Sequence, residues 1–198
     1  EQFLLTEEER DQLLNLCMEH IAGRASVIVT CSHFSTQIAA ARAKTAAERG
    51  ADMIMIMPPY HGALLKAGQE GIIQHFHAVA EVSRLPIMVQ DAPLSGVELS
   101  VDLLVRLAQE IPGVSYFKIE TPQTADKLRA LIHAGGDAIL GPFDGEESIT
   151  LIADLNAGAS GTMPSALLPD LIKPILSNHK EGNLKRASEL YAEILPLI

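Results

Sequence analysis

The chain has 198 residues, of which 47% are hydrophobic and 4% aromatic, and its 15 basic and 25 acidic residues give a formal net charge of −10. This apolar fraction is ordinary for a globular protein with a sizeable core, and the length suits one domain or a small pair. The acidic balance, with no cluster of Lys or Arg, disfavours a nucleic-acid partner. No apolar run reaches the roughly 18 to 20 residues that would span a bilayer, so we expect no membrane partner.

The two cysteines, Cys17 and Cys31, lack CxxC spacing and have no His or Cys cluster nearby. The opening residues are acidic where a signal peptide would be basic. We therefore expect a cytoplasmic protein with two structural thiols.

Six short apolar runs, rich in β-branched residues and Met, alternate with segments of helical periodicity. Such nearly continuous apolar runs are typical of parallel strands that are covered on both faces. The expected strands are 27–30, 53–57, 87–90, 114–118, 138–140 and 159–163. The expected helices are 6–21, 36–49, 69–84, 100–110, 124–133, 147–156 and 184–195.

The repeat of strand and helix indicates the fold class. Six successive units suit either a doubly wound sheet or a (β/α)8 TIM barrel. No GxGxxG follows the first strand and no GxxxxGK[ST] occurs, which weakens the nucleotide-binding open sheets. A barrel needs eight units in about 250 residues, whereas this chain begins on a helix with a Thr6/Glu9 capping box. We expect residues 1–198 to be a partial TIM barrel of about six units, with the first two strands and the C-terminal helices missing.

Lys118 is the residue that the pattern singles out for chemistry. Reactive groups in parallel α/β folds lie at the carboxyl ends of strands, and Lys118 lies there between the apolar Phe117 and Ile119. Burying an unpaired ammonium costs several kcal/mol, so these surroundings favour the neutral amine that a Schiff-base nucleophile requires. The alternative is a strand-end lysine whose amine reaches solvent.

Four motifs occur in order along the chain. They are segment 50–60, ending in Pro58-Pro59-Tyr60; segment 85–96, with Pro93 and Ser95-Gly96; the Phe117-Lys118 strand; and the Gly158-Ala159-Ser160-Gly161 turn. Together they resemble the dihydrodipicolinate synthase / N-acetylneuraminate lyase family over nearly the whole chain. The resemblance implies a TIM barrel, usually a homotetramer, whose strand-six lysine forms a Schiff base with a 2-keto acid. Lys118 takes that position.

The chain departs from the family at its proton-transferring residues. Many members have a tyrosine where this chain has Gln90, and a second where His61 follows Tyr60. An amide has no group that titrates near neutral pH, so Gln90 cannot shuttle protons. Glu120 lies two residues beyond Lys118, on the same face of an extended strand, and could take over the acid–base work. The alternative for Glu120 is a loop carboxylate that caps the next helix.

These departures resemble the subgroup that dehydrates 2-keto-3-deoxy sugar acids. They imply a catalytic domain with hydro-lyase activity in pentose degradation. The expected reaction is the dehydration of 2-keto-3-deoxy-L-arabonate to α-ketoglutarate semialdehyde. The expected catalytic residues are Lys118, Glu120 and Tyr60, and the expected substrate-binding residues are His61, Gln90, Asp91, Thr162 and Ser165. We expect no metal and no organic cofactor, because the iminium is itself the electron sink. A structural turn is the equal alternative for Thr162 and Ser165.

Other functions stay open at this point. One is a pyruvate-releasing aldolase of the same family, which Gln90 disfavours. Another is a barrel that binds a sugar acid without turning it over. The family's carboxylate-binding turn would end at Glu1, so we expect part of the substrate pocket to precede this chain.

Overall fold

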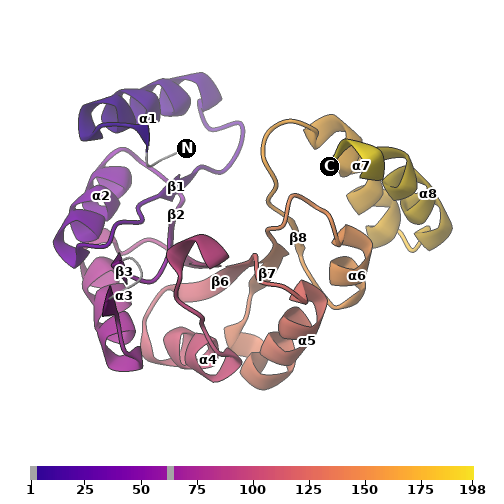
Figure 1. Cartoon of the computed structure of the whole chain (residues 1–198). Helices are drawn as coiled ribbons and strands as arrows, with labels where there is room; N and C mark the ends of the chain where they lie inside the picture. Colours follow the sequence, from indigo (N-terminus) through magenta and orange to yellow (C-terminus); the bar gives the residue numbers. More distant parts are fainter. Residues whose placement is uncertain (1–3, 62–64) are drawn as a thin grey trace.

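The computed structural model of the protein describes residues 4–61 and 65–198, and of residues 61, 65 and 66 it describes the backbone alone. Six parallel strands form one sheet in the order β1-β2-β5-β6-β7-β8. Figure 1 shows this sheet curled, with helices along its outer side. The strands are β1 (Ile28–Thr30), β2 (Met53–Ile56), β5 (Ile87–Asp91), β6 (Val114–Ile119), β7 (Gly141–Asp144) and β8 (Gly161–Thr162). The expected α/β fold of six strand-and-helix units is confirmed.

Helices lie along the outer side of the sheet. They are α1 (Glu7–Ile21), α2 (Thr36–Glu48), α3 (Gln69–Ser83), α4 (Val101–Glu110), α5 (Thr124–Gly135), α6 (Leu151–Asn156), α7 (Pro169–Lys180) and α8 (Leu184–Ile194). Helices α2 to α6 occur between successive strands of the sheet. Short 3-10 turns are η2 (Pro93–Ser95), η3 (Gly136–Ala138) and η4 (Leu195–Leu197). After β2, the strands β3 (Tyr60–His61) and β4 (Leu65–Lys66) form a separate antiparallel hairpin.

Two helices begin where their capping residues predict. Thr6 and Glu9 form the expected capping box at α1, in which the Thr6 hydroxyl accepts the Glu9 N–H and the Glu9 carboxylate accepts the Thr6 N–H at 2.8 Å. Ser100 caps α4 by accepting the Leu103 N–H at 3.2 Å. Each cap satisfies a backbone N–H that has no partner within the helix.

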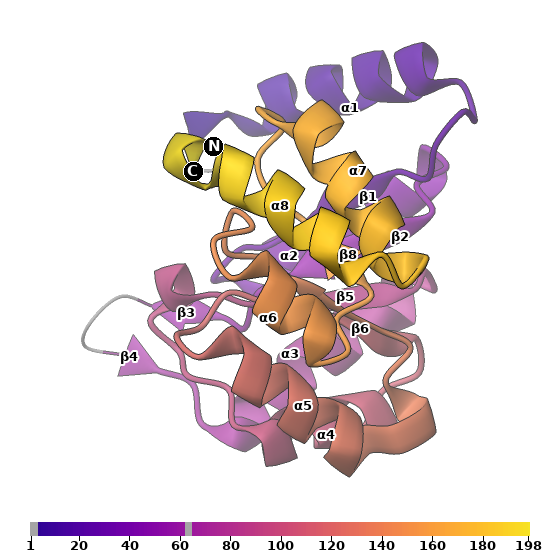
Figure 2. The ribbon, with the colours of Figure 1, turned by 90° about the vertical axis from the view of Figure 1, so that its right-hand side faces the viewer.

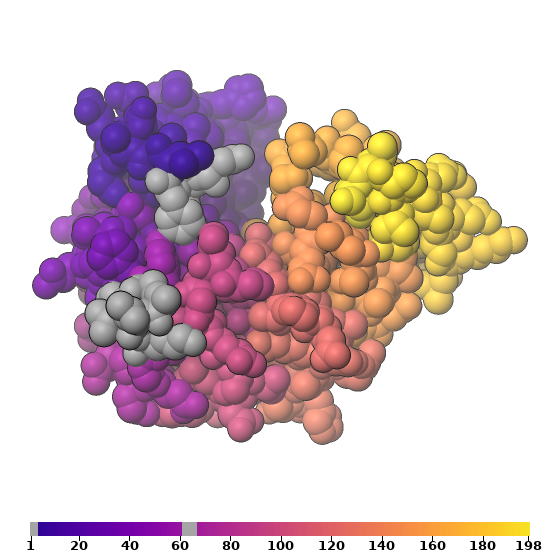
Figure 3. All heavy atoms as spheres, in the orientation of Figure 1, coloured from indigo at the N-terminus to yellow at the C-terminus, as the bar shows by residue number. Residues whose placement is uncertain are grey.

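Alternation along the strands separates the core from the concave face. Phe117 and Ile119 of β6 are fully buried in the main apolar cluster, which fills the space between sheet and helices. Lys118 lies between them and therefore faces the other way, toward the concave side. Its register partners, Gln90 on β5 and Phe143 on β7, share that side. The space-filling view shows the surface hollowed between the N-terminal part and the C-terminal helices (Figure 3).

A second apolar cluster lies under the C-terminal helices. Leu151 of α6, Ile172 and Ile175 of α7, and Ala187 and Ile194 of α8 are buried against one another. Figure 2 shows α7 and α8 side by side next to α6. The C-terminal helices thus pack through α6 onto the body of the sheet.

The strand expected at 138–140 is wrong, because the strand is β7, three residues further on. The Gly141-Pro142 pair is typical of a turn rather than a strand. In the sheet, however, a Cβ at Gly141 would come within 2.8 Å of the Tyr116 ring, so glycine is needed there. Proline has no N–H to donate, but the Pro142 carbonyl still accepts a hydrogen bond from the Ser160 N–H, just before β8, at 2.7 Å.

Two differences affect the helices. The helix expected at 147–156 begins only at Leu151, because Glu147 and Ser148 have φ of 51° and 67°, outside the right-handed helical region. Helix α7 was not predicted, because Pro174 interrupts its sequence pattern. Within α7 the Pro174 carbonyl accepts a hydrogen bond from the Asn178 side chain at 2.8 Å.

Candidate active site

Lys118 and Glu120 meet at the carboxyl end of β6. The Lys118 Nζ lies 2.6 Å from Glu120 Oε1, and their side chains are 14% and 18% exposed. Alternation along the strand brings the two side chains to one face, as expected. The carboxylate of Glu120 lies beside the amine and offsets the cost of burying an ammonium.

Gln90 completes this cluster from the neighbouring strand. Gln90 pairs in register with Lys118, so both side chains point to the same side of the sheet. The Gln90 Nε2 donates to Glu120 Oε1 at 3.0 Å. Glu120 Oε1 therefore contacts both the Lys118 amine and the Gln90 amide. Glu120 does not cap the following helix, α5.

A second carboxylate, which the sequence reasoning missed, follows β7. Glu146 comes directly after Gly145, and burial raises its pKa above the ordinary value. The negative charges of Asp144 and Glu120 raise the pKa further, while a hydrogen bond with Thr124 lowers it. The only signal in the sequence was an acidic pair behind a glycine at a strand end.

Asp91 lies on the opposite face of β5 from Gln90. Its carboxylate is 1% exposed, and Oδ2 lies 2.6 Å from the Lys127 Nζ of α5. Burial raises the pKa of Asp91, while the hydrogen bond and the charge of Lys127 lower it. Asp91 was expected to bind substrate beside Gln90, but consecutive residues of a strand point to opposite faces, so the structure does not bring it to Lys118.

Thr162 forms part of a buried network rather than the concave surface. Its hydroxyl donates to Asp144 Oδ2 at 2.7 Å and lies 3.0 Å from Ser148 Oγ. Asp144 is fully buried and also accepts the Glu146 N–H at 2.9 Å. The register that pairs Asp144 with both Ile119 and Thr162 sets this network on the face away from Lys118. The structure thus places the Thr162 hydroxyl in a buried network, and its contact with substrate stays a prediction.

Ser165 lies in the exposed loop after β8. Its N–H donates to Glu147 Oε2 at 2.8 Å, which ties this loop to the loop after β7. The role of Ser165 in substrate binding stays a prediction.

Tyr60 lies in the hairpin strand β3. Its ring meets the Phe34 ring edge to face, with centroids 6.3 Å apart. Burial raises the pKa of Tyr60, while the positive charges of Arg42 and Arg10 lower it. The catalytic role of Tyr60 stays a prediction. The side chain of His61 and the whole of Glu1 lie outside the described residues.

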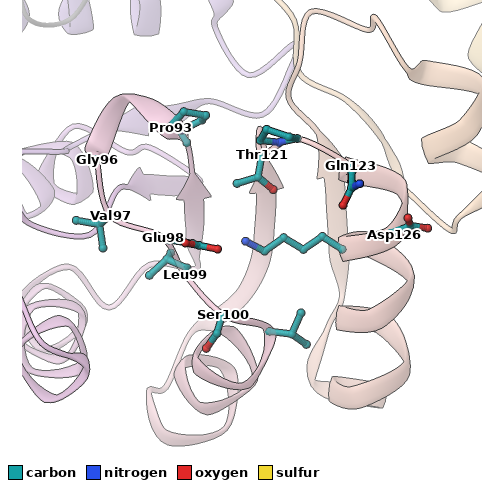
Figure 4. A pocket seen from close by; sticks show the side chains of 13 residues that line it. Pro93, Gly96, Val97, Glu98, Leu99, Ser100, Thr121, Gln123 and Asp126 are labelled. Carbon is teal, nitrogen blue, oxygen red and sulfur yellow. The ribbon is translucent and has the colours of Figure 1, made fainter.

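A cavity lies between the segment that follows β5 and the segment that follows β6. It has a volume of about 670 Å³, and Lys127 is among its lining residues. Figure 4 shows Ser100 and Thr121 in the same lining. It adjoins the Asp91–Lys127 pair, and neither Lys118 nor Glu120 lines it. The cavity is therefore separate from the Lys118 cluster.

The structure describes residues 4–61 and 65–198. Within these ranges no three His, Cys, Asp or Glu side chains gather as metal ligands. No helix in the same ranges combines the length and hydropathy needed to cross a bilayer. Cys17 and Cys31 are free thiols, and burial raises the pKa of Cys31 to about 12.

Comparison with known proteins places this geometry in a family. The model of the Dihydrodipicolinate synthetase family matches residues 1–198, and the chain belongs to that family. It is 54% identical over 198 residues to the L-2-keto-3-deoxyarabonate dehydratase of Azospirillum brasilense, covering all of this chain and 64% of that protein. It is 30% identical over 194 residues to the 4-hydroxy-tetrahydrodipicolinate synthase of Corynebacterium diphtheriae, covering 96% of this chain and 62% of that one. The chain thus spans less than two thirds of the length of these relatives.

Solved structures agree on the fold. The crystal structure of dihydrodipicolinate synthase from Acinetobacter baumannii, a complex with pyruvate, superposes with a TM-score of 0.90 at 28% identity, over all of this chain and 66% of that one. The 4-hydroxy-tetrahydrodipicolinate synthase of Methylacidiphilum fumariolicum gives a TM-score of 0.89 at 27% identity, over 98% of this chain and 63% of that one. The resemblance and the TIM-barrel fold expected from the sequence are confirmed.

Proposed function

We propose that the protein is a Schiff-base-forming dehydratase that converts 2-keto-3-deoxy-L-arabonate to α-ketoglutarate semialdehyde. The observation that carries this proposal is the cluster of Lys118, Glu120 and Gln90, in which an amine and an amide meet one carboxylate oxygen. The 54% identity to a dehydratase of this sugar acid supports the choice of substrate. The crystallised relative from A. baumannii, a complex with pyruvate, supports a 2-keto acid as ligand.

In the first step Lys118 attacks the C2 ketone. Glu120 accepts a proton from the ammonium, and the neutral Nζ adds to C2 to form a carbinolamine. Loss of the C2 oxygen as water then gives the iminium. The 2.6 Å separation of Nζ and Oε1 supports this proton transfer, because it is a hydrogen-bond distance.

In the second step the iminium acidifies the C3 protons. A carboxylate removes one of them, and the electron pair moves into the C–N system to give an enamine. The enamine then expels the C4 hydroxyl, which leaves as water after taking up a proton. Glu120 can serve first as base and then as acid, because a carboxylate that has accepted the C3 proton can return it to the leaving oxygen. A base then removes a C5 proton from the conjugated iminium, the resulting dienamine takes up a proton at C3, and C4 and C5 become an enol. Water hydrolyses the C2 iminium, which frees Lys118, and the released enol takes up a proton at C4 and loses its hydroxyl proton to give the aldehyde.

Gln90 holds Glu120 rather than transferring protons. Its Nε2 donates to Oε1, the oxygen that also contacts Lys118, which leaves Oε2 without a hydrogen bond to any described residue. We propose that Oε2 faces the substrate and carries the proton at C3 and C4. Tyr60 and His61 are proposed to orient the sugar hydroxyls.

Two other functions have less support from the residues of the site. Aldol cleavage of the C3–C4 bond would release pyruvate and requires a base at the C4 hydroxyl, the role of the tyrosine that Gln90 replaces. A barrel that binds a sugar acid without turnover would gain nothing from a buried lysine paired with a carboxylate.

The test is to trap the adduct and identify the product. Borohydride with pyruvate, and with 2-keto-3-deoxy-L-arabonate, should fix a stable adduct on Lys118, located by peptide mass spectrometry. An adduct that forms at an undiminished rate in Lys118→Ala would contradict the proposal. An enzymatic assay for the semialdehyde, run beside a lactate-dehydrogenase assay for pyruvate, separates dehydration from aldol cleavage.

We further propose a homotetramer in the cytoplasm, on the basis of the family resemblance. Light scattering after size-exclusion chromatography measures the assembled mass. A monomer at micromolar concentration would contradict the tetramer.

A further inference from the structure

Gly145 lies against the Lys118–Glu120 pair. It follows Asp144 at the end of β7, it is buried, and its φ is not in the left-handed region. The backbone conformation therefore does not demand glycine here. The surroundings do, because a Cβ at this position would overlap Glu120 Cγ and come within 2.8 Å of Lys118 Cε and 2.9 Å of Lys118 Cγ.

We propose that Gly145 is a positioning residue of the active site, which sets the Glu120 carboxylate against the Lys118 amine by leaving the space that both side chains fill. This inference rests on the proposed function, because it assigns Gly145 to the same site. Gly145 itself contributes no chemical group, so it acts through Glu120.

The backbone on both sides of this contact is held in place. The Gly145 N–H donates to the Ile119 carbonyl at 3.0 Å, and the Glu120 N–H donates to the Asp91 carbonyl at 2.9 Å. Next to Gly145, the buried Asp144 accepts the Glu146 N–H and the Thr162 hydroxyl. Neither backbone can retreat without breaking these bonds. An added methyl group must therefore displace side chains.

Glu120 is the side chain that must move. Its Cγ is only two bonds from Cα, and a new χ1 rotamer would carry the carboxylate away from Gln90 and Lys118. Lys118 can adjust more easily, since its long chain has several rotatable bonds. Water can replace Glu120 as acceptor of the ammonium proton in the first step, whereas the transfers at C3 and C4 need the carboxylate in place. Gly145→Ala should therefore disturb dehydration more than it disturbs formation of the Schiff base.

The experiment compares dehydration and trapping in Gly145→Ala, Glu120→Ala and the double variant. A misplacement of about 1 Å can cost roughly 10²-fold in rate, so we expect kcat to fall about 100-fold in Gly145→Ala. The rate of borohydride trapping with pyruvate should fall less than tenfold. In the Glu120→Ala background the same glycine change should cost less than threefold, because the side chain that it displaces is absent.

Gly161→Ala is the matched control. Gly161 lies in the same sheet, and a Cβ there would meet Phe143 at 3.4 Å, an ordinary contact distance. This variant should keep kcat within twofold, and the thermal unfolding of every variant is measured to exclude misfolding. A crystal structure of Gly145→Ala should show Glu120 Oε1 beyond hydrogen-bonding distance of Lys118 Nζ.

Three outcomes would overturn the inference. They are an unchanged kcat in Gly145→Ala, an equal loss in the presence and absence of Glu120, and an undisplaced Glu120 in the crystal structure. Failure of the proposed function looks different, because the wild-type protein would then fail to dehydrate the sugar acid. The trapping rates and the crystal structure would still test Gly145 in that case.

Discussion

Asp91 and Lys127 form a buried ion pair that joins β5 to α5 at 2.6 Å, with Asp91 1% exposed and Lys127 15% exposed. The pair lies behind Gln90, on the face of the sheet that the helices cover. It connects the strand next to Lys118 with the helix that follows Lys118 in the chain.

Loss of Lys127 should therefore destabilise the fold. Removing one partner of a buried pair leaves an uncompensated charge, and we expect Lys127→Ala to lower the free energy of unfolding by about 3 kcal/mol. Urea denaturation measures the free energy of unfolding of the wild type and the variant. The matched control is Lys44→Ala, because Lys44 pairs with Glu48 at the surface and should cost less than about 1 kcal/mol. Equal effects of the two substitutions would contradict a buried role for Lys127.

Glu120→Gln should separate shape from acid–base chemistry. The amide keeps the size of the side chain but cannot accept a proton, so we expect kcat for dehydration to fall by about 10²- to 10⁴-fold. Glu98→Gln is the control, because Glu98 is an exposed carboxylate that lines the neighbouring cavity. An active Glu120→Gln variant would assign the proton transfer to another group.

Thr162→Val tests whether the hydroxyl binds substrate or supports the loop. The change removes the hydrogen bond to the fully buried Asp144. We expect the free energy of unfolding to fall by about 1 to 3 kcal/mol, since the buried acceptor loses a partner. KM should stay within about threefold of wild type. A large rise in KM with unchanged stability would restore Thr162 as a substrate-binding residue.

Asp154 should make stability depend on pH. It is fully buried, and burial raises its pKa from 3.8 to about 6, while the hydrogen bond from Thr150 lowers it. The folded state thus holds a proton that the unfolded state has released. The resulting stability is fully present below pH 4 and is lost as pH rises through about 6, a change of up to about 3 kcal/mol.

The measurement is the free energy of unfolding of wild type and Asp154→Asn between pH 4 and pH 8. The difference between the two proteins should change in favour of the asparagine variant as pH rises through about 6. Asp170→Asn, at an exposed position in the first turn of α7, should show no such change. A constant difference across the range would contradict the raised pKa of Asp154.

The fold could be predicted well from the sequence wherever the apolar pattern was continuous. Strands β2 and β5 were found because Met53–Ile56 and residues 87–89 form unbroken, largely buried apolar runs. The predicted position of strand β7 was three residues too early, because Gly141 and Pro142 are typical of turns. In the fold, contacts with Tyr116 and Ser160 override that local preference. The start of α6 was misplaced for a similar reason, since the left-handed backbone at Glu147 and Ser148 has no clear signature in the sequence.

The candidate site divides in the same way. The proximity of Lys118 and Glu120 could be predicted because residues two apart in an extended segment share a face whatever the rest of the chain does. The sequence did not indicate that Asp91 pairs with Lys127 or that Thr162 bonds to Asp144, because the face that a strand-end residue takes depends on register and on neighbouring strands. Gly145 was missed because it has no chemical group.

By itself, the order of residues determined the repeating strand-and-helix units and the family, and it predicted Lys118 as the reactive amine, since these depend on local periodicity and on short motifs. Only the tertiary structure decided which polar side chains contact Lys118 and which form hydrogen bonds or ion pairs on the face of the sheet that the helices cover. The physical reason is that strand register and packing bring distant residues within hydrogen-bonding distance, and a single sequence does not record these separations.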